Sequence, residues 1–158
     1  MELYKYIIAS VLALSLVSGP AAAQEKPISL EGDVKLEKTI VEEDGGSRVE
    51  LVEPEIIVPG DRLVFGTDYR NNGSEAVVNF VVTNPLPDAV RLAPDADPDL
   101  VVSVDGGSSW ESLANLTVTE EDGSVRPAEY ADVTHIRWTL ALVGPGERGR
   151  LEYPAIIR

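Results

Sequence analysis

The sequence predicts an all-β fold, either a sandwich or a barrel. Three observations lead to this class: apolar residues recur at every second position in many short runs, turn signals separate these runs at regular intervals, and no helical period appears after the N-terminal apolar segment. Alternation is what a half-buried strand needs, because successive side chains point to opposite faces of a sheet. Several short strands with regular turns are typical of sandwiches and barrels.

The N-terminus of the 158-residue chain has the pattern of an export signal. An apolar stretch over 6–17 follows a lysine, and the small residues Ala21 and Ala23 fit a signal-peptidase site. The stretch is short for a membrane span, and nothing later in the chain is apolar enough for one. We therefore expect no transmembrane segment in the mature chain. The expected organisation is a signal peptide over 1–23, a flexible leader over 24–33 and one domain over 34–158.

The composition narrows the range of partners. The formal net charge is −14, with 27 acidic and 13 basic residues. Such a surface repels nucleic acid and anionic lipid head groups, so no nucleic-acid partner is expected. The chain contains no cysteine, which excludes disulfides and a lipid-modified cysteine. Stability must therefore come from burial and from hydrogen bonds within the sheets.

The clearest strand pair lies in "VPGDRLVFGTDYRNNGSEAVVNFVVTNPLP", residues 58–87. A Pro-Gly-Asp turn precedes a period-two run over 62–70, and a second run follows over 75–83. The turn between them contains Asn72-Gly73, which tolerates the positive φ angles of a tight connection. Two prolines after the second run end its ladder pairing.

The same combination of a turn signal between two alternating runs repeats along the chain, with Asp-Gly pairs as further hairpin signals. Pro154 interrupts the final run, which predicts that the last strand lies at a sheet edge or carries a bulge. The predicted strands lie over 34–42, 49–53, 62–70, 75–83, 90–92, 100–105, 116–119, 134–143 and 148–157.

The run at 58–87 resembles the opening half of the bacterial and archaeal surface repeat called domain of unknown function eleven. The later stretches "VSVDGGSSW", "ADVTHIRWTL" and "VGPGERGRLEYPAIIR" resemble its closing half, so the likeness covers about residues 36–158. The resemblance implies an immunoglobulin-like antiparallel β-sandwich without a Cys–Trp–Cys core and without known catalysis. It also implies a place in the cell envelope, because such repeats occur in large envelope and surface proteins.

We therefore expect a non-catalytic, exported structural or assembly module of the prokaryotic cell envelope, in the periplasm or at the cell surface. Its expected partner is an envelope or surface protein. The alternative is an adhesin-type module that binds a glycan or a protein. An enzyme is not expected, because His135 is the only histidine. Strand alternation places it opposite the apolar face, exposed, rather than in a triad with Ser108 or Ser109.

One acidic loop is a candidate metal site. In "APDADPDL", Asp95, Asp97 and Asp99 are two residues apart. Carboxylates at this spacing can converge on Ca²⁺ in a curved loop. The loop lacks the glycine and the closing glutamate of an EF-hand, so a solvated acidic loop is the main interpretation and calcium binding the alternative. No other cofactor is predicted.

Two residues are candidates for partner binding. Trp110 follows the turn at 105–109 and either anchors a partner or a glycan, or caps one end of the sandwich core. Ile156 lies on the last predicted strand and faces away from its apolar set. An exposed isoleucine on an edge strand is a plausible docking point for strand addition by a partner.

Overall fold

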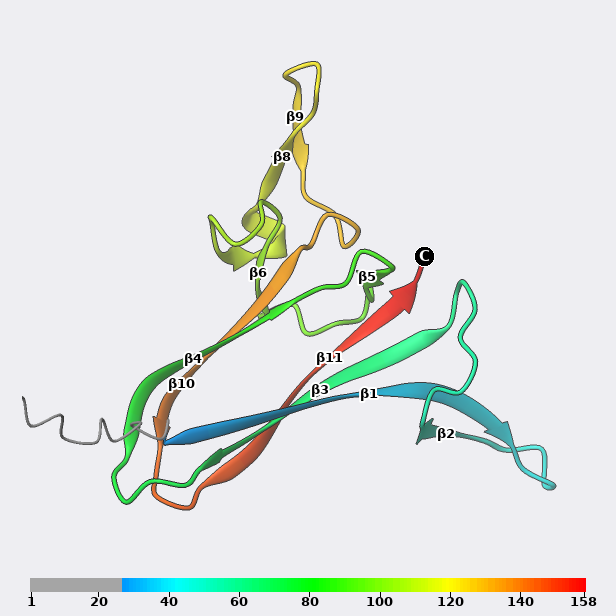
Figure 1. Cartoon of the computed structure of the whole chain (residues 1–158). Coiled ribbons are helices and arrows are strands. Elements are labelled where there is room, and N and C mark those ends of the chain that lie inside the picture. The colour runs from blue at the N-terminus through cyan, green and yellow to red at the C-terminus, as the bar shows by residue number, and fades with distance from the viewer. Residues whose placement is uncertain (1–26) are drawn as a thin grey trace, which may run out of the picture.

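A computed structural model of the protein describes residues 27–158. The predicted signal peptide over 1–23 lies outside the described residues, as do residues 24–26 of the leader. The described chain is all-β, and two antiparallel sheets pack as a sandwich, which confirms the predicted fold class (Figure 1).

The first sheet has five strands and the second has four. The first sheet has the order β2 (Ser47–Val52), β1 (Ile28–Val41), β3 (Arg62–Asn71), β11 (Arg148–Ile157) and β5 (Val90–Leu92). The second has the order β4 (Val77–Pro85), β10 (His135–Val143), β6 (Val101–Ser103) and β7 (Glu111–Ser112). A short 3₁₀ turn (Leu113–Asn115) leads into a separate projecting hairpin of β8 (Thr117–Thr119) and β9 (Val125–Pro127) (Figure 1).

All nine predicted strands are present, but the predicted leader is wrong in part. β1 begins at Ile28, so residues 28–33 extend this strand along β3 instead of forming a flexible segment. Ile28 is buried and pairs with Asn71. Gly32 and the mixed charges hid the strand, because backbone pairing alone does not require apolar alternation. β7 and β9 were not predicted, since two or three residues are too few to show a period.

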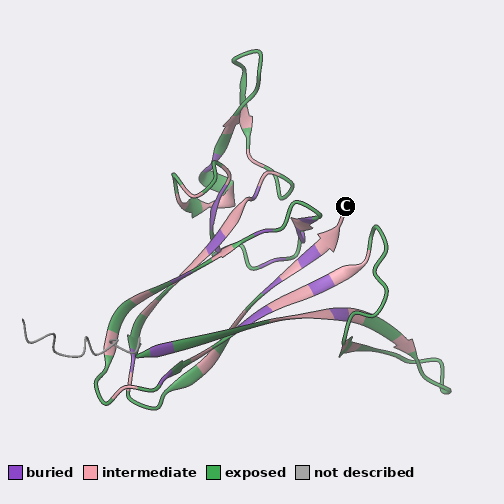
Figure 2. Cartoon of the chain, in the orientation of Figure 1, coloured by how far each residue is buried: buried purple, intermediate pink, exposed green. Residues whose placement is uncertain are grey.

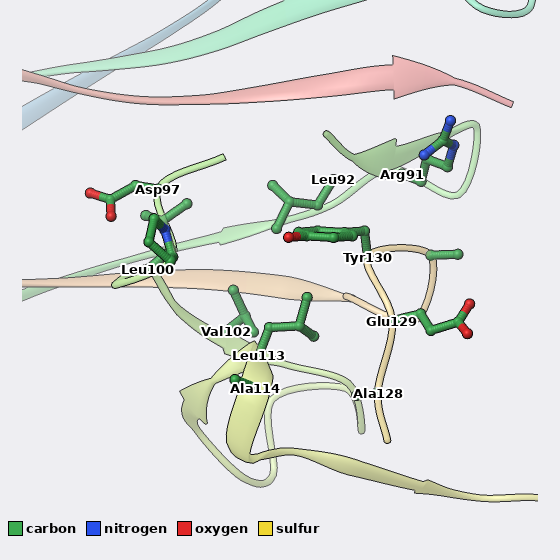
Figure 3. A pocket seen from close by; sticks show the side chains of 12 residues that line it. Arg91, Leu92, Asp97, Leu100, Val102, Leu113, Ala114, Ala128, Glu129 and Tyr130 are labelled. Carbon is green, nitrogen blue, oxygen red and sulfur yellow. The ribbon is translucent and has the colours of Figure 1, made fainter. Parts of the chain in front are cut away.

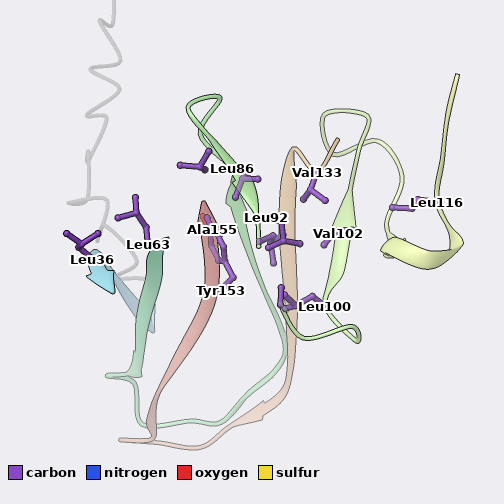
Figure 4. Packing of buried hydrophobic residues seen from close by; sticks show 13 residues of the cluster. Leu36, Leu63, Leu86, Leu92, Leu100, Val102, Leu116, Val133, Tyr153 and Ala155 are labelled. Carbon is purple, nitrogen blue, oxygen red and sulfur yellow. The ribbon is translucent and has the colours of Figure 1, made fainter. Parts of the chain in front are cut away.

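The core lies between the sheets, where β3, β11 and β5 of the first sheet face β6 and β10 of the second (Figures 2 and 4). Phe65 and Tyr153 stack with ring centroids 5.1 Å apart, and Trp138 of the opposite sheet lies 6.1 Å from Tyr153. Alternation predicts Ile136, Trp138, Leu140 and Leu142 on the inward face of β10 and Tyr153 on that of β11. Ile136 and Tyr153 are buried as predicted, but Leu142 near the end of β10 is 58% exposed. The aromatic stack therefore joins the two sheets.

A buried asparagine ties together the turns at the other end of the sandwich. The Nδ2 group of Asn71 donates to the carbonyls of Glu75 (2.8 Å) and Val143 (2.9 Å). Its Oδ1 accepts from the Gly73 N–H group (2.9 Å). Asn71 is fully buried, so this side chain replaces water for three backbone groups.

Candidate functional site

The three aspartates of the calcium candidate do not converge. Arg62 holds Asp95 through a two-pronged contact, Nη1 to Oδ1 at 2.6 Å and Nη2 to Oδ2 at 2.9 Å, and this lowers the pKa of Asp95. Asp97 Oδ1 instead accepts from the Asp99 N–H group at 2.9 Å. Within residues 27–158, no group of three or more potential ligand side chains is placed to hold a metal ion. The loop is held by local hydrogen bonds and one arginine.

Trp110 lies on the outer face of the second sheet, so the prediction that it caps the core is wrong. The Arg137 guanidinium sits over its ring, 3.6 Å from the centroid. Its Nε1 donates to the Gly107 carbonyl at 2.9 Å, and the His135 ring lies edge-on with centroids 6.2 Å apart. Arg137 and His135 flank the buried Ile136 along β10, which places the cluster on the face turned away from the core. His135 is therefore half-buried against Trp110 and not fully exposed as predicted.

The loop before Trp110 is organised by one carboxylate. Asp105 Oδ1 accepts from the backbone N–H groups of Ser108 (3.0 Å) and Ser109 (2.9 Å) and from the Ser103 hydroxyl (2.7 Å). The Ser109 hydroxyl donates to Asp105 Oδ2 at 2.6 Å. These hydrogen bonds hold the pKa of Asp105 far below its usual range, with the Ser109 hydroxyl as the largest cause. The two serines serve the turn and form no hydrogen bond with His135, whose Nδ1 contacts Thr134 Oγ1.

The prediction of a free edge at Ile156 is wrong. β5 pairs with β11 there, so Ile156 lies between Arg62 of β3 and Arg91 of β5 and is half-buried. Pro154 does fit a partly open edge: its carbonyl accepts from the Ala93 N–H group outside the β3 ladder. The nitrogen of Pro154, which carries no hydrogen, lies on the same side of the strand as this carbonyl. The ladder with β3 therefore loses no hydrogen bond. Strand addition at the C-terminus is therefore blocked by a strand of the same chain.

A cavity of about 410 Å³ opens beside β5 and β6 (Figure 3). Core residues such as Leu92 and Val102 form its wall, and the Tyr130 ring lies across it. Asp97 and Glu129 stand on opposite sides of that ring (Figure 3). The lining contains no serine, threonine or histidine. The cavity therefore lacks a serine or threonine nucleophile paired with a histidine base.

The most exposed apolar surface lies on the hairpin of β1 and β2 and on the segment that follows it. This hairpin extends beyond the rest of the first sheet and is mostly exposed (Figures 1 and 2). Of the thirteen large apolar side chains exposed in the described residues, six lie within 41–58, so the exposure is concentrated and not scattered. We call this set the hairpin patch: Val41, Val49, Leu51, Ile56, Ile57 and Val58.

Three members of the hairpin patch share one face of the hairpin. Pairing places Val49 opposite Thr39 and Leu51 opposite Glu37, on the face opposite to that of the buried Leu36. The exposed fractions are 74% for Val41, 60% for Val49 and 47% for Leu51. A strand with one apolar face normally turns that face to the core. Here the apolar stripe faces outward and is unpartnered.

The backbone of β2 is unpaired along its outer side, because β2 is the first strand of its sheet. The N–H group of Glu42 donates to the carbonyl of Gly46 (2.9 Å), which sets the phase of the ladder. Hydrogen-bonded pairs alternate in an antiparallel ladder. Ser47, Val49 and Leu51 therefore point their N–H and C=O groups away from β1, in a row that a further strand can pair with.

Two other open edges, those of β4 and β1, are less suited to pairing. β4 also carries exposed apolar residues, Val78 and Val81, but Asn79 between them has a φ of 51°, which interrupts a regular edge. β1 is open before Leu36 on the side of β2 and after Leu36 on the side of β3, and both parts carry charged side chains. Charges and kinks are how proteins protect sheet edges. β2 carries Arg48 and Glu50, but it lacks both a proline and a kink.

No family model, no curated protein and no solved structure matches the chain. The family resemblance stays a prediction. In the part of the chain that the structure describes, no helix has both the length and the apolar character to cross a bilayer.

The strand over 49–53 was predicted from sequence, and its apolar period was visible. What the sequence did not show is that this strand is outermost, with its apolar face outward.

Proposed function

We propose that the protein is a non-catalytic, exported assembly module of the prokaryotic cell envelope. It associates with its partner through the outer edge of β2. The observation that carries this proposal is the coincidence of an unpaired strand edge with the outward apolar stripe of Val41, Val49 and Leu51. Main-chain bonds to an added strand supply affinity, and the side chains beside it supply specificity.

Both the main-chain hydrogen bonds and the side-chain contacts contribute to the free energy of association. Burial of an aliphatic side chain that was fully exposed stabilises by about 1.5–3 kcal/mol. The three stripe residues are each about half exposed or more. Covering each of them therefore contributes about 1 kcal/mol to the free energy of association. Each new backbone hydrogen bond adds about 0.5–1.5 kcal/mol net. Together these terms support a specific but modest association.

The alternative, glycan binding at Trp110, has less support. Sugars stack on an open aromatic face, but one face of Trp110 is covered by Arg137 and its neighbour His135 lies edge-on. Its indole N–H group is already bonded to Gly107. The side chain is therefore used within the molecule, to hold the 105–109 loop on the sheet.

Site-specific cross-linking in intact cells of the native host tests the proposal. A photoactivatable residue at Val49 should give a covalent adduct with one defined partner. The same residue at Val125, which is exposed to a similar extent on β9, is the control and should give none. A protein that stays monomeric and unlinked from both positions would contradict the assembly role.

A further inference from the structure

We infer that the strand that closes the β2 edge is β2 of a second copy of this chain, antiparallel and centred on Val49. The inference rests on the proposed function, because it names the partner of the same edge. It also specifies a twofold-symmetric dimer, in which the same patch is used by both copies.

The backbone phase allows this register. The outward-pointing residues of β2 are Ser47, Val49 and Leu51, as the Glu42–Gly46 hydrogen bond fixes. An antiparallel pair centred on Val49 places each Val49 opposite the other, and each Ser47 opposite Leu51 of the second copy. All three facing pairs are then of the hydrogen-bonded kind, so every outward N–H and C=O group of the strand gains a partner.

The charges of β2 select this register over its neighbour. Centring on Val49 places Arg48 opposite Glu50 of the second copy, and the symmetry makes this ion pair twice. Shifting the centre to Glu50 also satisfies the backbone. That register, however, sets Glu50 against Glu50 and leaves Arg48 against Val52. Like charges directly opposite each other destabilise a sheet, and opposite charges stabilise it.

Arg48 is free enough to change partners. Within its own chain it lies 3.2 Å from Glu42 and 3.6 Å from Glu50, in pairs whose side chains are all 42–56% exposed. Exposed ion pairs of this kind contribute little to stability. Re-pairing across the dimer therefore costs little.

The outward apolar stripe is also self-complementary. In the Val49-centred dimer the two hairpins lie in one continuous sheet, so their stripes join on the same face. The stripe residues of one copy then lie beside those of the other, with Val49 at the centre. This pairing covers part of the most concentrated apolar surface of the described chain.

Sedimentation equilibrium on the purified mature protein tests the inference through a charge exchange. Arg48→Glu and Glu50→Arg should each weaken dimerisation by about tenfold or more, because each places like charges across the interface twice. The double variant Arg48→Glu/Glu50→Arg should return to within about threefold of the natural chain, since the pairs re-form in reverse. Glu111→Arg on β7, an exposed site with the same change of charge, should have no effect.

The outcomes separate the inference from the proposed function. A natural chain that stays monomeric over the concentration range, or a double variant that fails to recover, overturns the β2–β2 dimer. If Val49 in cells then cross-links to a different protein, the assembly role stands with another partner. If Val49 gives no adduct at all, both fail. Thermal unfolding of each variant checks that the sandwich itself is intact.

Discussion

The guanidinium carbon of Arg137 lies 3.6 Å from the centroid of the Trp110 ring. The contact forms on the outer face of β10 and leaves Nε of Arg137 buried without a hydrogen-bond partner. A cation over an aromatic face is attracted by the ring electrons. The pair therefore fastens the 105–109 loop to the sheet from outside the core.

The first prediction is that this contact is worth a modest amount of stability. Trp110→Ala should lower the free energy of unfolding by about 1–2 kcal/mol, measured by urea denaturation. A double-mutant cycle with Arg137→Ala should give a coupling of about 0.5–1 kcal/mol. Purely additive effects would show that the contact carries no energy. A loss of about 4 kcal/mol, as for a core aromatic, would show that Trp110 packs as a core residue.

The second prediction concerns two neighbouring asparagines. Asn71→Ala should lower the free energy of unfolding by about 3 kcal/mol, because it leaves the buried carbonyl of Val143 and the partly buried backbone groups of Gly73 and Glu75 unpaired. Asn72→Ala is the matched control, since Asn72 is exposed and its side chain bonds only the Ser29 hydroxyl. It should change stability by no more than about 0.5 kcal/mol. Equal effects of the two substitutions would contradict the tie between the turns.

The third prediction is a loss of stability at high pH. Burial raises the pKa of Tyr153 to about 12, above a value of about 10 in the unfolded chain. Since the folded state keeps its proton longer, stability is constant below pH 10 and falls as pH rises from 10 to 12, by about 2 kcal/mol at the upper limit. Tyr153→Phe keeps the stack with Phe65 and should remove most of this fall. Urea denaturation of both proteins at several pH values measures it, and parallel curves would contradict the assignment.

The fourth prediction concerns Ca²⁺. We expect titration calorimetry to show no tight, stoichiometric binding of Ca²⁺. The carboxylate of Asp95 is paired with Arg62, and the carboxylate of Asp97 accepts a hydrogen bond from a backbone N–H group. Asp97→Asn should leave the thermogram unchanged. A one-to-one site at micromolar concentration that this substitution removes would contradict the geometry of the loop.

The strands were predictable because their signal is local. Alternation along 62–70 and 148–157 gave both the strands and their inward faces, and Tyr153 is buried as its period required. The extension of β1 to Ile28 was missed because residues 28–33 are held by pairing with β3, and not by an apolar period of their own.

The positions of strands within the sheets were not predictable in the same way. The sequence predicts a free edge at Ile156 because nothing in its own strand shows that Val90–Leu92 pairs beside it. Trp110 was assigned to the core or to open solvent, whereas its partner is a cation 27 positions further along the chain. The β2 edge was hidden for the same reason: which strand is outermost depends on contacts between distant segments.

Amide hydrogen exchange at Val49 tests the central claim, that a second β2 closes this edge, most directly. In the isolated chain the Val49 N–H group points outward and should exchange rapidly. We expect its exchange to slow as the protein is concentrated through the range in which dimers form, together with that of Leu51, while the amide of Val81 on the β4 edge stays unchanged. Exchange at Val49 that is equally fast at every concentration would contradict the claim.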